Sequence, residues 1–378
     1  MIFIINKMEF QKVIKNINLY ADLINKDRIN IMEVCGTHTN SIAKYGINTV
    51  ISNKVNLLSG PGCPVCVTSK EYIDAAVELA LKGITVVTFG DLIKVKGTYK
   101  SLAMEKSEGR DIRVIYSVSE VFKIAKEMSK SEVVFLGVGF ETTAPLIGYL
   151  VEKAYEKNIS NLSFLTSIKV MPPILEKILS SKNKNIHGII CPGNVAVITG
   201  SNSFKFIYKK YSIPSVVCGF EAIEILGGIY FLIKEIYKKS LDSPSKGLEN
   251  LYRGFVSPFG NQYAKNTIKK IFKVEDGFWR GIGKVKASAL VIRDEYSSFD
   301  AVSKYNLQGY FKKNIDSREG EKKDNCRCQD VLLGNINPFQ CKLFRNKCTP
   351  IDPCGPCMVS SEGACRAYYK YGYKDLKN

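Results

Sequence analysis

The strongest constraint on the fold is a repeated order of short apolar runs, each followed by a turn rich in Gly, Pro or Cys and then by a helical pattern. Runs rich in β-branched residues, such as 84–89 and 133–138, are typical of strands that are buried on both faces of a sheet. Their alternation with helices predicts parallel sheets covered by helices. We therefore expect an α/β fold with two Rossmann-like parallel-sheet domains. The predicted strands lie at 31–34, 55–58, 84–89, 114–116, 133–138, 163–168, 188–190 and 215–217, followed by a long helix at about 222–237.

Composition divides the chain into three predicted parts. Residues 1–126 form the first α/β domain, residues 127–240 form the second, and residues 241–378 form a carboxyl-terminal segment. The polar stretch 241–247 has the composition of a linker. Toward the end the cysteine content rises sharply, at Cys326, Cys328, Cys341, Cys348, Cys354, Cys357 and Cys365. Such a density is typical of a cluster or metal domain rather than of an apolar core.

The overall charge and hydropathy exclude several classes of protein. The formal charge is +18, but the Lys and Arg residues are spread along the chain and no nucleic-acid motif accompanies them. This pattern favours a solvated basic surface over a nucleic-acid interface. No apolar run approaches the roughly 18 to 20 residues that span a bilayer, and the amino-terminal run is too short for a signal peptide. We expect a cytoplasmic protein that binds neither nucleic acid nor membranes.

The chain contains 12 cysteines. Without a secretion signal, this number indicates metal, cluster or redox thiols in a reducing compartment rather than structural disulfides. The most constrained pair is Cys63 and Cys66, in the loop 60–66, which Pro61 and Pro64 stiffen. A C-x-x-C pair is either redox-active or half of a metal site.

Another thiol, Cys35, directly follows the predicted strand 31–34. Helix amino-terminal amides and a nearby imidazole both favour a thiolate, and His38 lies three residues further on. We therefore expect Cys35 to be reactive, with a buried structural cysteine as the alternative. Cys35 and His38 together with Cys63 and Cys66 would also supply the four ligands of a tetrahedral zinc site. The sequence leaves that alternative open.

Further polar and thiol side chains follow other predicted strands. Glu141, Thr142 and Thr143 follow one of them, and Cys191 and Cys218 follow two later ones. Ligands bind beyond the carboxyl ends of the strands in open α/β sheets, so these loops are expected to line one site. Glu141 is expected to act there as an acid or base, with a fixed structural carboxylate as the alternative.

The carboxyl-terminal cysteines have the spacing Cys326-x14-Cys341-x6-Cys348-x16-Cys365, which differs from the bacterial ferredoxin pattern and from a paired zinc ribbon. Four thiolates on irregular loops can hold an iron-sulfur cluster, and structural zinc is the alternative. We therefore expect a small cysteine-rich iron-sulfur domain at the end of the chain.

Together these motifs resemble the HypD family of hydrogenase formation proteins. The resemblance extends over nearly the whole chain and rests on Cys35–Thr39, Gly60–Cys66, Gly139–Thr143, Trp279–Gly281 and Cys357–Cys365. It implies a scaffold for assembly of the Fe(CN)2CO moiety of nickel-iron hydrogenase. It also implies a small scaffold partner, HypC, a cyanide donor, HypE, and a hydrogenase large subunit that receives the product.

The resemblance further implies roles for individual residues. Cys35 would bind iron jointly with a cysteine of HypC while cyanide and carbon monoxide are added as ligands. The expected catalytic set around it is the redox pair Cys63 and Cys66 with His38, Glu141, Thr142 and Thr143. A 4Fe-4S cluster would be held by Cys326, Cys341, Cys348 and Cys365, with Cys328 as a substitute for Cys326 and with Cys354 and Cys357 as extra redox thiols.

Two positions depart from the family pattern. Asn194 stands where the family usually has histidine, and Ala222 stands where it usually has proline. The dithiol and the cluster would also suit a second class of function, a cluster-dependent thiol-disulfide reductase. Cys35 beside His38 has no necessary task in such a reductase, which favours the scaffold. Whether the protein is itself an enzyme is left open by the sequence.

Overall fold

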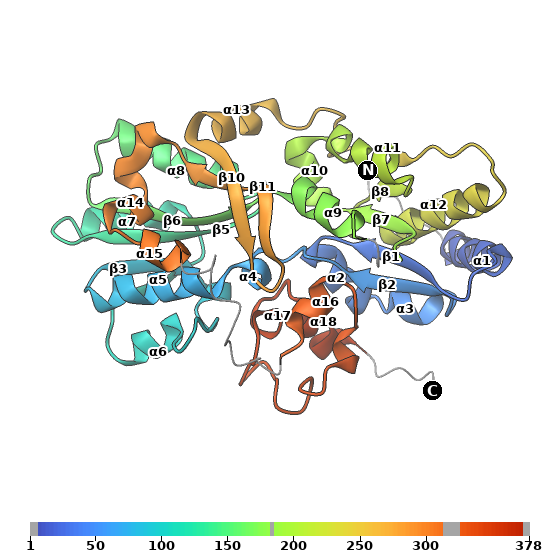
Figure 1. Cartoon of the computed structure of the whole chain (residues 1–378), viewed down its shortest axis with the longest axis horizontal. Helices are drawn as coiled ribbons and strands as arrows, with labels where there is room; N and C mark the ends of the chain where they lie inside the picture. The colour runs from blue at the N-terminus through green and yellow to red at the C-terminus, as the bar shows by residue number, and fades with distance from the viewer. Residues whose placement is uncertain (1–6, 182–184, 313–325, 373–378) are drawn as a thin grey trace.

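The computed structural model of the chain describes residues 7–181, 185–312 and 326–372. It contains two sheets, and a small carboxyl-terminal region packs where they meet (Figure 1). The first sheet is parallel throughout, in the order β2 (Val55–Ser59), β1 (Ile29–Glu33), β7 (Gly188–Cys191), β8 (Ser215–Val217) and β9 (Leu248–Asn250). The second has the order β10 (Phe272–Trp279), β11 (Gly283–Ile292), β6 (Leu162–Lys169), β5 (Val133–Gly139), β3 (Thr85–Phe89) and β4 (Ile112–Ile115). The predicted α/β class is confirmed.

The second sheet is parallel from β6 to β4, and the hairpin β10–β11 joins its edge in antiparallel orientation. Every predicted strand is present, with shifts of one or two residues at the ends. The hairpin and β9 were not predicted. Three consecutive exposed residues, 274–276, interrupt β10, so its sequence lacks the continuous apolar run of the parallel strands.

Each sheet takes strands from two separate stretches of the chain. β1 and β2 come from the first predicted domain and share a sheet with β7 and β8 of the second. The boundaries 126 and 240 therefore do not coincide with the sheets. Parallel strands are joined by long crossovers, and local periodicity does not record which sheet the next strand enters.

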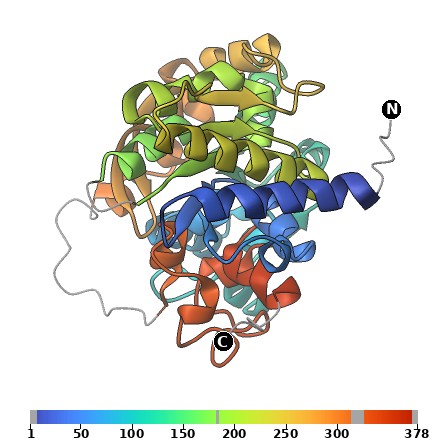
Figure 2. The same ribbon diagram turned by 90° about the vertical axis from the view of Figure 1, so that its right-hand side faces the viewer.

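Helices cover the faces of both sheets, and short helices form most of the carboxyl-terminal region. Their bounds are α1 (Lys7–Leu23), α2 (Gly36–Lys44), α3 (Ile47–Val50), α4 (Pro64–Val67), α5 (Lys70–Leu81), α6 (Leu102–Ser107), α7 (Ser119–Glu127), α8 (Ala144–Glu156), α9 (Met171–Leu179), α10 (Gly193–Thr199), α11 (Lys205–Tyr211), α12 (Ala222–Ser240), α13 (Gln262–Ile271), α14 (Ala301–Lys304), α15 (Gln308–Lys312), α16 (Cys328–Leu332), α17 (Pro356–Val359) and α18 (Ala364–Tyr371). The predicted long helix after β8 is α12. On the first sheet, α1 and α12 lie side by side (Figure 2).

Local capping explains how the helix behind the C-x-x-C loop begins. The hydroxyl of Ser69 accepts a hydrogen bond from the Tyr72 amide at 3.3 Å and caps α5. The hydroxyl of the neighbouring Thr68 donates to the Pro64 carbonyl at 2.9 Å and closes α4. Gly83, with a φ of 79°, follows the end of α5.

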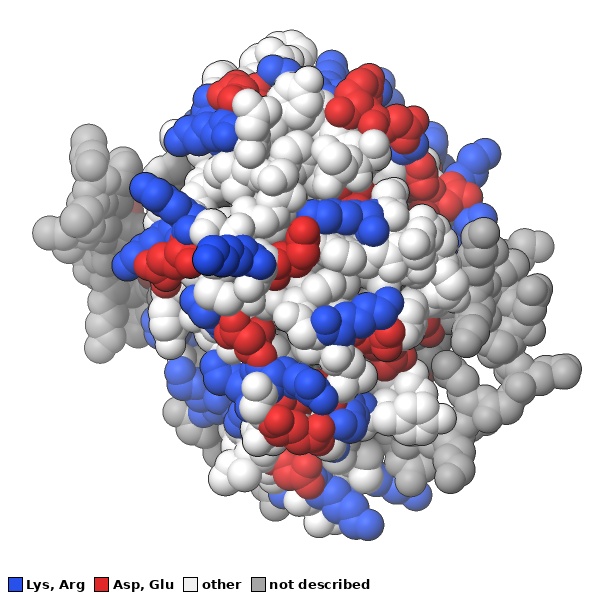
Figure 3. Space-filling model, turned by 90° about the vertical axis from the view of Figure 1, so that its left-hand side faces the viewer, with Lys and Arg blue, Asp and Glu red and all other residues white. Residues whose placement is uncertain are grey.

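The largest apolar core spans both sheets, which places the loops at their carboxyl ends over one continuous support. Basic and acidic side chains alternate on the face shown in Figure 3, in agreement with a solvated surface. Within the described ranges, no helix has both the length and the apolar character needed to cross a membrane.

Candidate functional site

The Cys35 loop and the Gly60–Cys66 loop lie against each other at the carboxyl ends of β1 and β2. The Gly36 amide donates to the Gly62 carbonyl at 3.1 Å, and the Gly60 amide donates to the Glu33 carbonyl at 2.7 Å. A Cβ added at Gly62 would lie 2.5 Å from the Cα of Cys35. Glycine is therefore required at this position because the two backbones approach so closely.

Cys35 is the N-cap residue of α2, and its side chain is 7% exposed. Burial is the main cause that raises the pKa of its thiol to about 12, and the carboxylates of Glu362 and Glu33 raise it further. Backbone amides of Thr37 and His38 act in the opposite direction. The predicted amide contribution is thus present, but burial outweighs it and keeps the thiol protonated at neutral pH.

The imidazole of His38 does not support a thiolate at Cys35. Its Nε2 donates to the Gly219 carbonyl at 3.0 Å and lies 3.8 Å from the Cys218 Sγ. The ring packs against Phe220, with 4.6 Å between the ring centroids. Burial lowers the pKa of His38 to about 4, so the ring is neutral at neutral pH. The expectation that this imidazole favours the Cys35 thiolate is therefore wrong, because the ring faces the end of β8.

Cys63 and Cys66 form a disulfide, with their Cα atoms 5.3 Å apart. Cys63 is the N-cap residue of α4, and both sulfurs are buried. Sulfurs joined to each other cannot act as two thiolate ligands, so the zinc arrangement with Cys35 and His38 is not present in this structure. The disulfide is the pairing that a redox-active C-x-x-C forms, and its redox activity stays a prediction.

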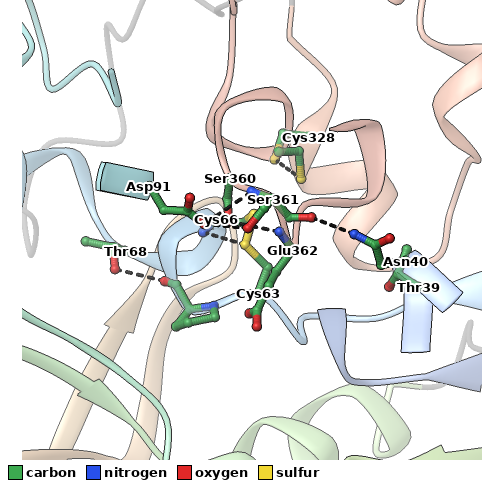
Figure 4. The surroundings of a disulfide bond; sticks show 12 residues. Thr39, Asn40, Cys63, Cys66, Thr68, Asp91, Cys328, Ser360, Ser361 and Glu362 are labelled. Atoms are coloured by element: carbon green, nitrogen blue, oxygen red, sulfur yellow. Dashed lines mark hydrogen bonds between the residues drawn. A yellow bond between two sulfur atoms is a disulfide. The ribbon is translucent and has the colours of Figure 1, made fainter. Parts of the chain in front are cut away.

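A loop of the carboxyl-terminal region covers this site. Asp91 accepts hydrogen bonds from the hydroxyls of Ser360 and Ser361 at 3.1 and 2.9 Å, and Asn40 donates to the Ser361 carbonyl at 3.0 Å (Figure 4). A Cβ at Gly36 would lie 2.5 Å from the Cβ of Glu362. Burial, with repulsion from Asp91, raises the pKa of Glu362 to about 6. The sequence reasoning gave Glu362 no role, although it lies within the motif Cys357–Cys365.

Behind this loop the carboxyl-terminal thiols gather. The sulfurs of Cys328 and Cys357 lie 2.8 Å apart and share a hydrogen bond. Helix α17, which carries Cys357, contacts α4. In Figure 4, Cys328 lies close to the Cys63–Cys66 disulfide. A second pair of thiols therefore lies near the first.

Three of the four predicted cluster ligands interact with one another. Cys326 is electrostatically coupled to Cys348 and Cys365, and the Cys354 amide donates to the Cys348 Sγ at 3.3 Å. Cys341 is buried in the same region. Thiolates are the ligands that iron-sulfur clusters require, so the donor chemistry of these residues fits such a group. Across residues 7–181, 185–312 and 326–372, however, no three His, Cys, Asp or Glu side chains already have the arrangement of a metal site.

The hairpin β10–β11 connects the two thiol pairs through its tip. The Arg280 amide donates to the Val67 carbonyl at 2.8 Å, which ties the tip to α4, and its guanidinium donates to the Lys96 carbonyl at 3.0 Å. The hydrogen bond from Cys357, and then the charge of Arg280, lower the pKa of Cys328. Beside it, Trp279 stacks on Phe140. Sequence reasoning used this motif only as a family marker and missed its electrostatic role.

Glu141 follows β5, and one of its oxygens accepts a hydrogen bond from the Met171 amide at 2.8 Å, at the start of α9. Its second oxygen is buried and has no hydrogen-bond partner among the described residues. Burial raises the pKa of Glu141 to about 7. Thr143 is the N-cap residue of α8, and Thr142 is exposed. Both the helix-capping role and the predicted acid-base role of Glu141 are compatible with this geometry.

Cys191 and Cys218 follow neighbouring strands but pack into different cores. Cys191 lies in the core that spans both sheets, whereas Cys218 lies in the core beneath α12. Successive residues of a strand face opposite sides, and Cys191 is paired with Val217 in the sheet register. Asn194 donates to the Thr37 hydroxyl at 3.4 Å. This amide thus lies next to the Cys35 loop.

Comparison with known proteins agrees with the motifs of this site. The family model HypD, described as "Hydrogenase formation hypA family", matches residues 8–372. The chain belongs to the HypD family. It is 38% identical over 371 residues to a hydrogenase expression/formation protein of Methanocaldococcus jannaschii, covering 98% of this chain and 99% of that protein. It is 36% identical to the hydrogenase maturation factors HypD of Cupriavidus necator, over 92% of this chain and 91% of the relative, and of Escherichia coli, over 91% and 89%.

Two buried charged residues of this HypD-family chain escaped the sequence reasoning. Glu33 lies under Cys35, accepts its amide hydrogen at 3.0 Å, and also accepts from the Thr39 hydroxyl. Burial raises the pKa of Glu33 to about 7. Lys169, at the end of β6, is 7% exposed, and burial lowers its pKa to about 8. A single charged residue at the end of an otherwise uncharged strand was the signal available in both cases.

Proposed function

We propose that the protein is a scaffold for assembly of the Fe(CN)2CO moiety of nickel-iron hydrogenase, working with HypC and HypE before transfer to the hydrogenase large subunit. The observation that supports it best is the meeting of three sulfur centres at one junction of the fold. These are Cys35, the Cys63–Cys66 disulfide, and the pair Cys328 and Cys357. Iron is the cargo of this scaffold.

Cys35 would bind the iron as a thiolate, together with a cysteine of HypC. Because its pKa is about 12, iron binding has to displace the thiol proton. A cation at this position also relieves the repulsion that the carboxylates of Glu33 and Glu362 exert on the thiolate. Soft thiolate ligands suit low-spin iron that carries cyanide and carbon monoxide.

The two thiol pairs would exchange electrons by thiol-disulfide exchange. The Cys328 thiolate attacks one sulfur of the Cys63–Cys66 disulfide, and the resulting mixed disulfide is resolved by the thiol of Cys357. Two electrons and the thiol protons pass to Cys63 and Cys66, and a Cys328–Cys357 disulfide forms. The low pKa of Cys328 and the short sulfur contact to Cys357 favour this direction of attack.

Cys326, Cys341, Cys348 and Cys365 would hold a 4Fe-4S cluster, whose chemistry when bound is the supply of single electrons. The protein's own contribution is to fix these thiols on the loops around α17 and α18. The hydrogen bonds of Asp91 to Ser360 and Ser361 hold the same loops against the Cys35 site.

Infrared spectroscopy of the protein purified anaerobically with HypC tests the proposal. We expect cyanide and carbon monoxide stretching bands in the wild-type complex and hydrogenase maturation in a reconstituted assay. A Cys63→Ala, Cys66→Ala double variant should lose maturation, whereas Cys191→Ala, which removes a buried thiol of the same sheet, should retain it. Normal maturation by the double variant would refute the redox role of the pair.

The alternative is a cluster-dependent thiol-disulfide reductase, which the proximity of the two thiol pairs also favours. Complete absence of diatomic-ligand bands under reducing, anaerobic conditions, combined with reduction of protein disulfides, would select this function. A reductase would not require a thiol that is buried between the carboxylates of Glu33 and Glu362, so we favour the scaffold.

A further inference from the structure

A cavity lies at the amino ends of β1 and β7, at the opposite end of the first sheet from Cys35. Its volume is about 290 Å³. It is lined by Ile24, Lys26, Ile186, His187, Ser212, Ile213, Ile236, Lys239 and Ser240. Four isoleucines provide an apolar wall, and the remaining side chains are basic or hydroxylic. Apolar walls with a few convergent polar groups are typical of small-molecule sites.

His187 presents an unused hydrogen-bond donor at this cavity. Its Nδ1 accepts a hydrogen bond from the Asn30 amide at 2.9 Å. In the neutral ring the proton is therefore on Nε2. This Nε2 is buried, and in the part of the chain that the structure describes it has no hydrogen-bond partner. Leaving a buried donor unpaired is unfavourable, and a ligand acceptor would pair it.

The charged side chains that line the cavity are basic. Burial, followed by repulsion from Lys26 and Lys239, lowers the pKa of His187. Lys239 donates to the Ser212 carbonyl at 2.7 Å, which holds its ammonium group at the rim. None of the described residues that line the cavity is acidic. Among the described lining residues, two cations and one N–H donor thus face the cavity and no carboxylate does.

We propose that this cavity is a binding site for a small organic anion. The anionic head would pair with Lys26 and Lys239 and accept the Nε2 proton of His187. The apolar body would pack on Ile186 and Ile213. The site does not depend on the iron-binding function proposed for Cys35, although β1 and β7 connect the two ends of the sheet.

Nuclear magnetic resonance of the two histidines tests the site directly, since the chain contains only His38 and His187. The 15N-labelled full chain is titrated with 3-methylbutanoate and, separately, with inorganic phosphate. We expect a saturable shift of the His187 imidazole signals with 3-methylbutanoate and a rise of the His187 pKa in its presence. His38, at the other end of the sheet, should not shift and serves as an internal control of folding.

Variants separate anion binding from non-specific effects. A Lys26→Met, Lys239→Met double variant should weaken 3-methylbutanoate binding at least tenfold, and Lys209→Met on α11 should leave it unchanged. Phosphate should bind more weakly, because it has no apolar body. A titration in which neither anion produces a saturable shift would overturn the proposal. Equal affinity of the wild type and the double variant for 3-methylbutanoate would also overturn it. Binding of phosphate but not of 3-methylbutanoate would overturn the claim that the ligand is an organic anion.

Discussion

Cys35 and Cys328 are thiols of one site, but their surroundings shift their pKa values in opposite directions. Cys35 sits in a tightly packed loop between two carboxylates, and burial raises its pKa to about 12. Cys328 is the first residue of the short helix α16, where Cys357 and Arg280 lower its pKa. A thiol that keeps its proton until a cation replaces it suits metal binding, and a thiol that ionises readily suits exchange. The difference supports the proposal that one region binds the cargo and the other transfers electrons.

The largest expected difference between Cys35 and Cys328 is in their rates of alkylation. At pH 8 the thiolate fraction of Cys35 is about 10⁻⁴, whereas that of Cys328 is higher because its pKa is lowered. Mass spectrometry after a pulse of iodoacetamide should therefore find Cys328 modified much faster than Cys35. The Cys35 rate should rise about tenfold per pH unit between pH 8 and 11. Equal alkylation rates for the two thiols would contradict the opposite shifts of their pKa values.

Glycine substitutions should show that the two regions differ in packing. In Gly62→Ala the new Cβ would collide with the backbone of Cys35, and we expect a loss of about 3 kcal/mol in the free energy of unfolding. In Gly355→Ala the neighbour is the flexible side chain of Cys326, so a loss of about 1 kcal/mol is expected. Urea unfolding measures both. A larger loss for Gly355→Ala than for Gly62→Ala would contradict the assignment of the tighter packing to the Cys35 loop.

Lys169 is a buried cation, and burial shifts its pKa as it shifts that of the Cys35 thiol. Its folded pKa of about 8 lies below the value near 10.4 of an unfolded chain. The unfolded state therefore binds more protons between these values, and stability rises with pH across that window by up to about 3 kcal/mol. Lys169→Met should lose this rise and should be more stable at pH 7 by about 1 to 3 kcal/mol. Thermal unfolding at pH 7 and pH 10 measures both effects, with Lys126→Met as the exposed control. A destabilised Lys169→Met at pH 7 would show that the ammonium group has a structural partner.

Of these substitutions, those at Arg280 should have the smallest effect, a change in the alkylation rate of Cys328. Arg280→Met removes a positive charge beside Cys328, so its pKa should rise and its alkylation at pH 7 should slow by roughly threefold to tenfold. Arg280→Lys should restore part of the rate, and Arg293→Met should leave it unchanged. The rate at Cys35 should not change in any of the three variants. An unaltered alkylation rate of Cys328 in Arg280→Met would show that Arg280 does not lower the pKa of Cys328.

Sequence reasoning located the strands and the thiols, because both depend on local pattern. It could not place Glu362 over Gly36 or Arg280 beside Cys328, since these contacts join residues that are distant in the chain. His38 shows the same limit at short range. The sequence shows that it lies three residues after Cys35, but the direction of its ring depends on the Gly219 carbonyl at the end of β8. The strands β1 to β8 were likewise predicted, but β9, the hairpin β10–β11 and the assignment of strands to sheets were not.

The most direct test of the division between cargo binding and exchange is the infrared spectrum of two variants purified with HypC under anaerobic, reducing conditions. The account predicts that the cyanide and carbon monoxide bands disappear in Cys35→Ala and that iron is lost with them. In Cys328→Ser the same bands should persist after chemical reduction of the protein, because the iron ligand is intact. Bands that survive in Cys35→Ala, or that vanish in reduced Cys328→Ser, would contradict the assignment of the iron to Cys35.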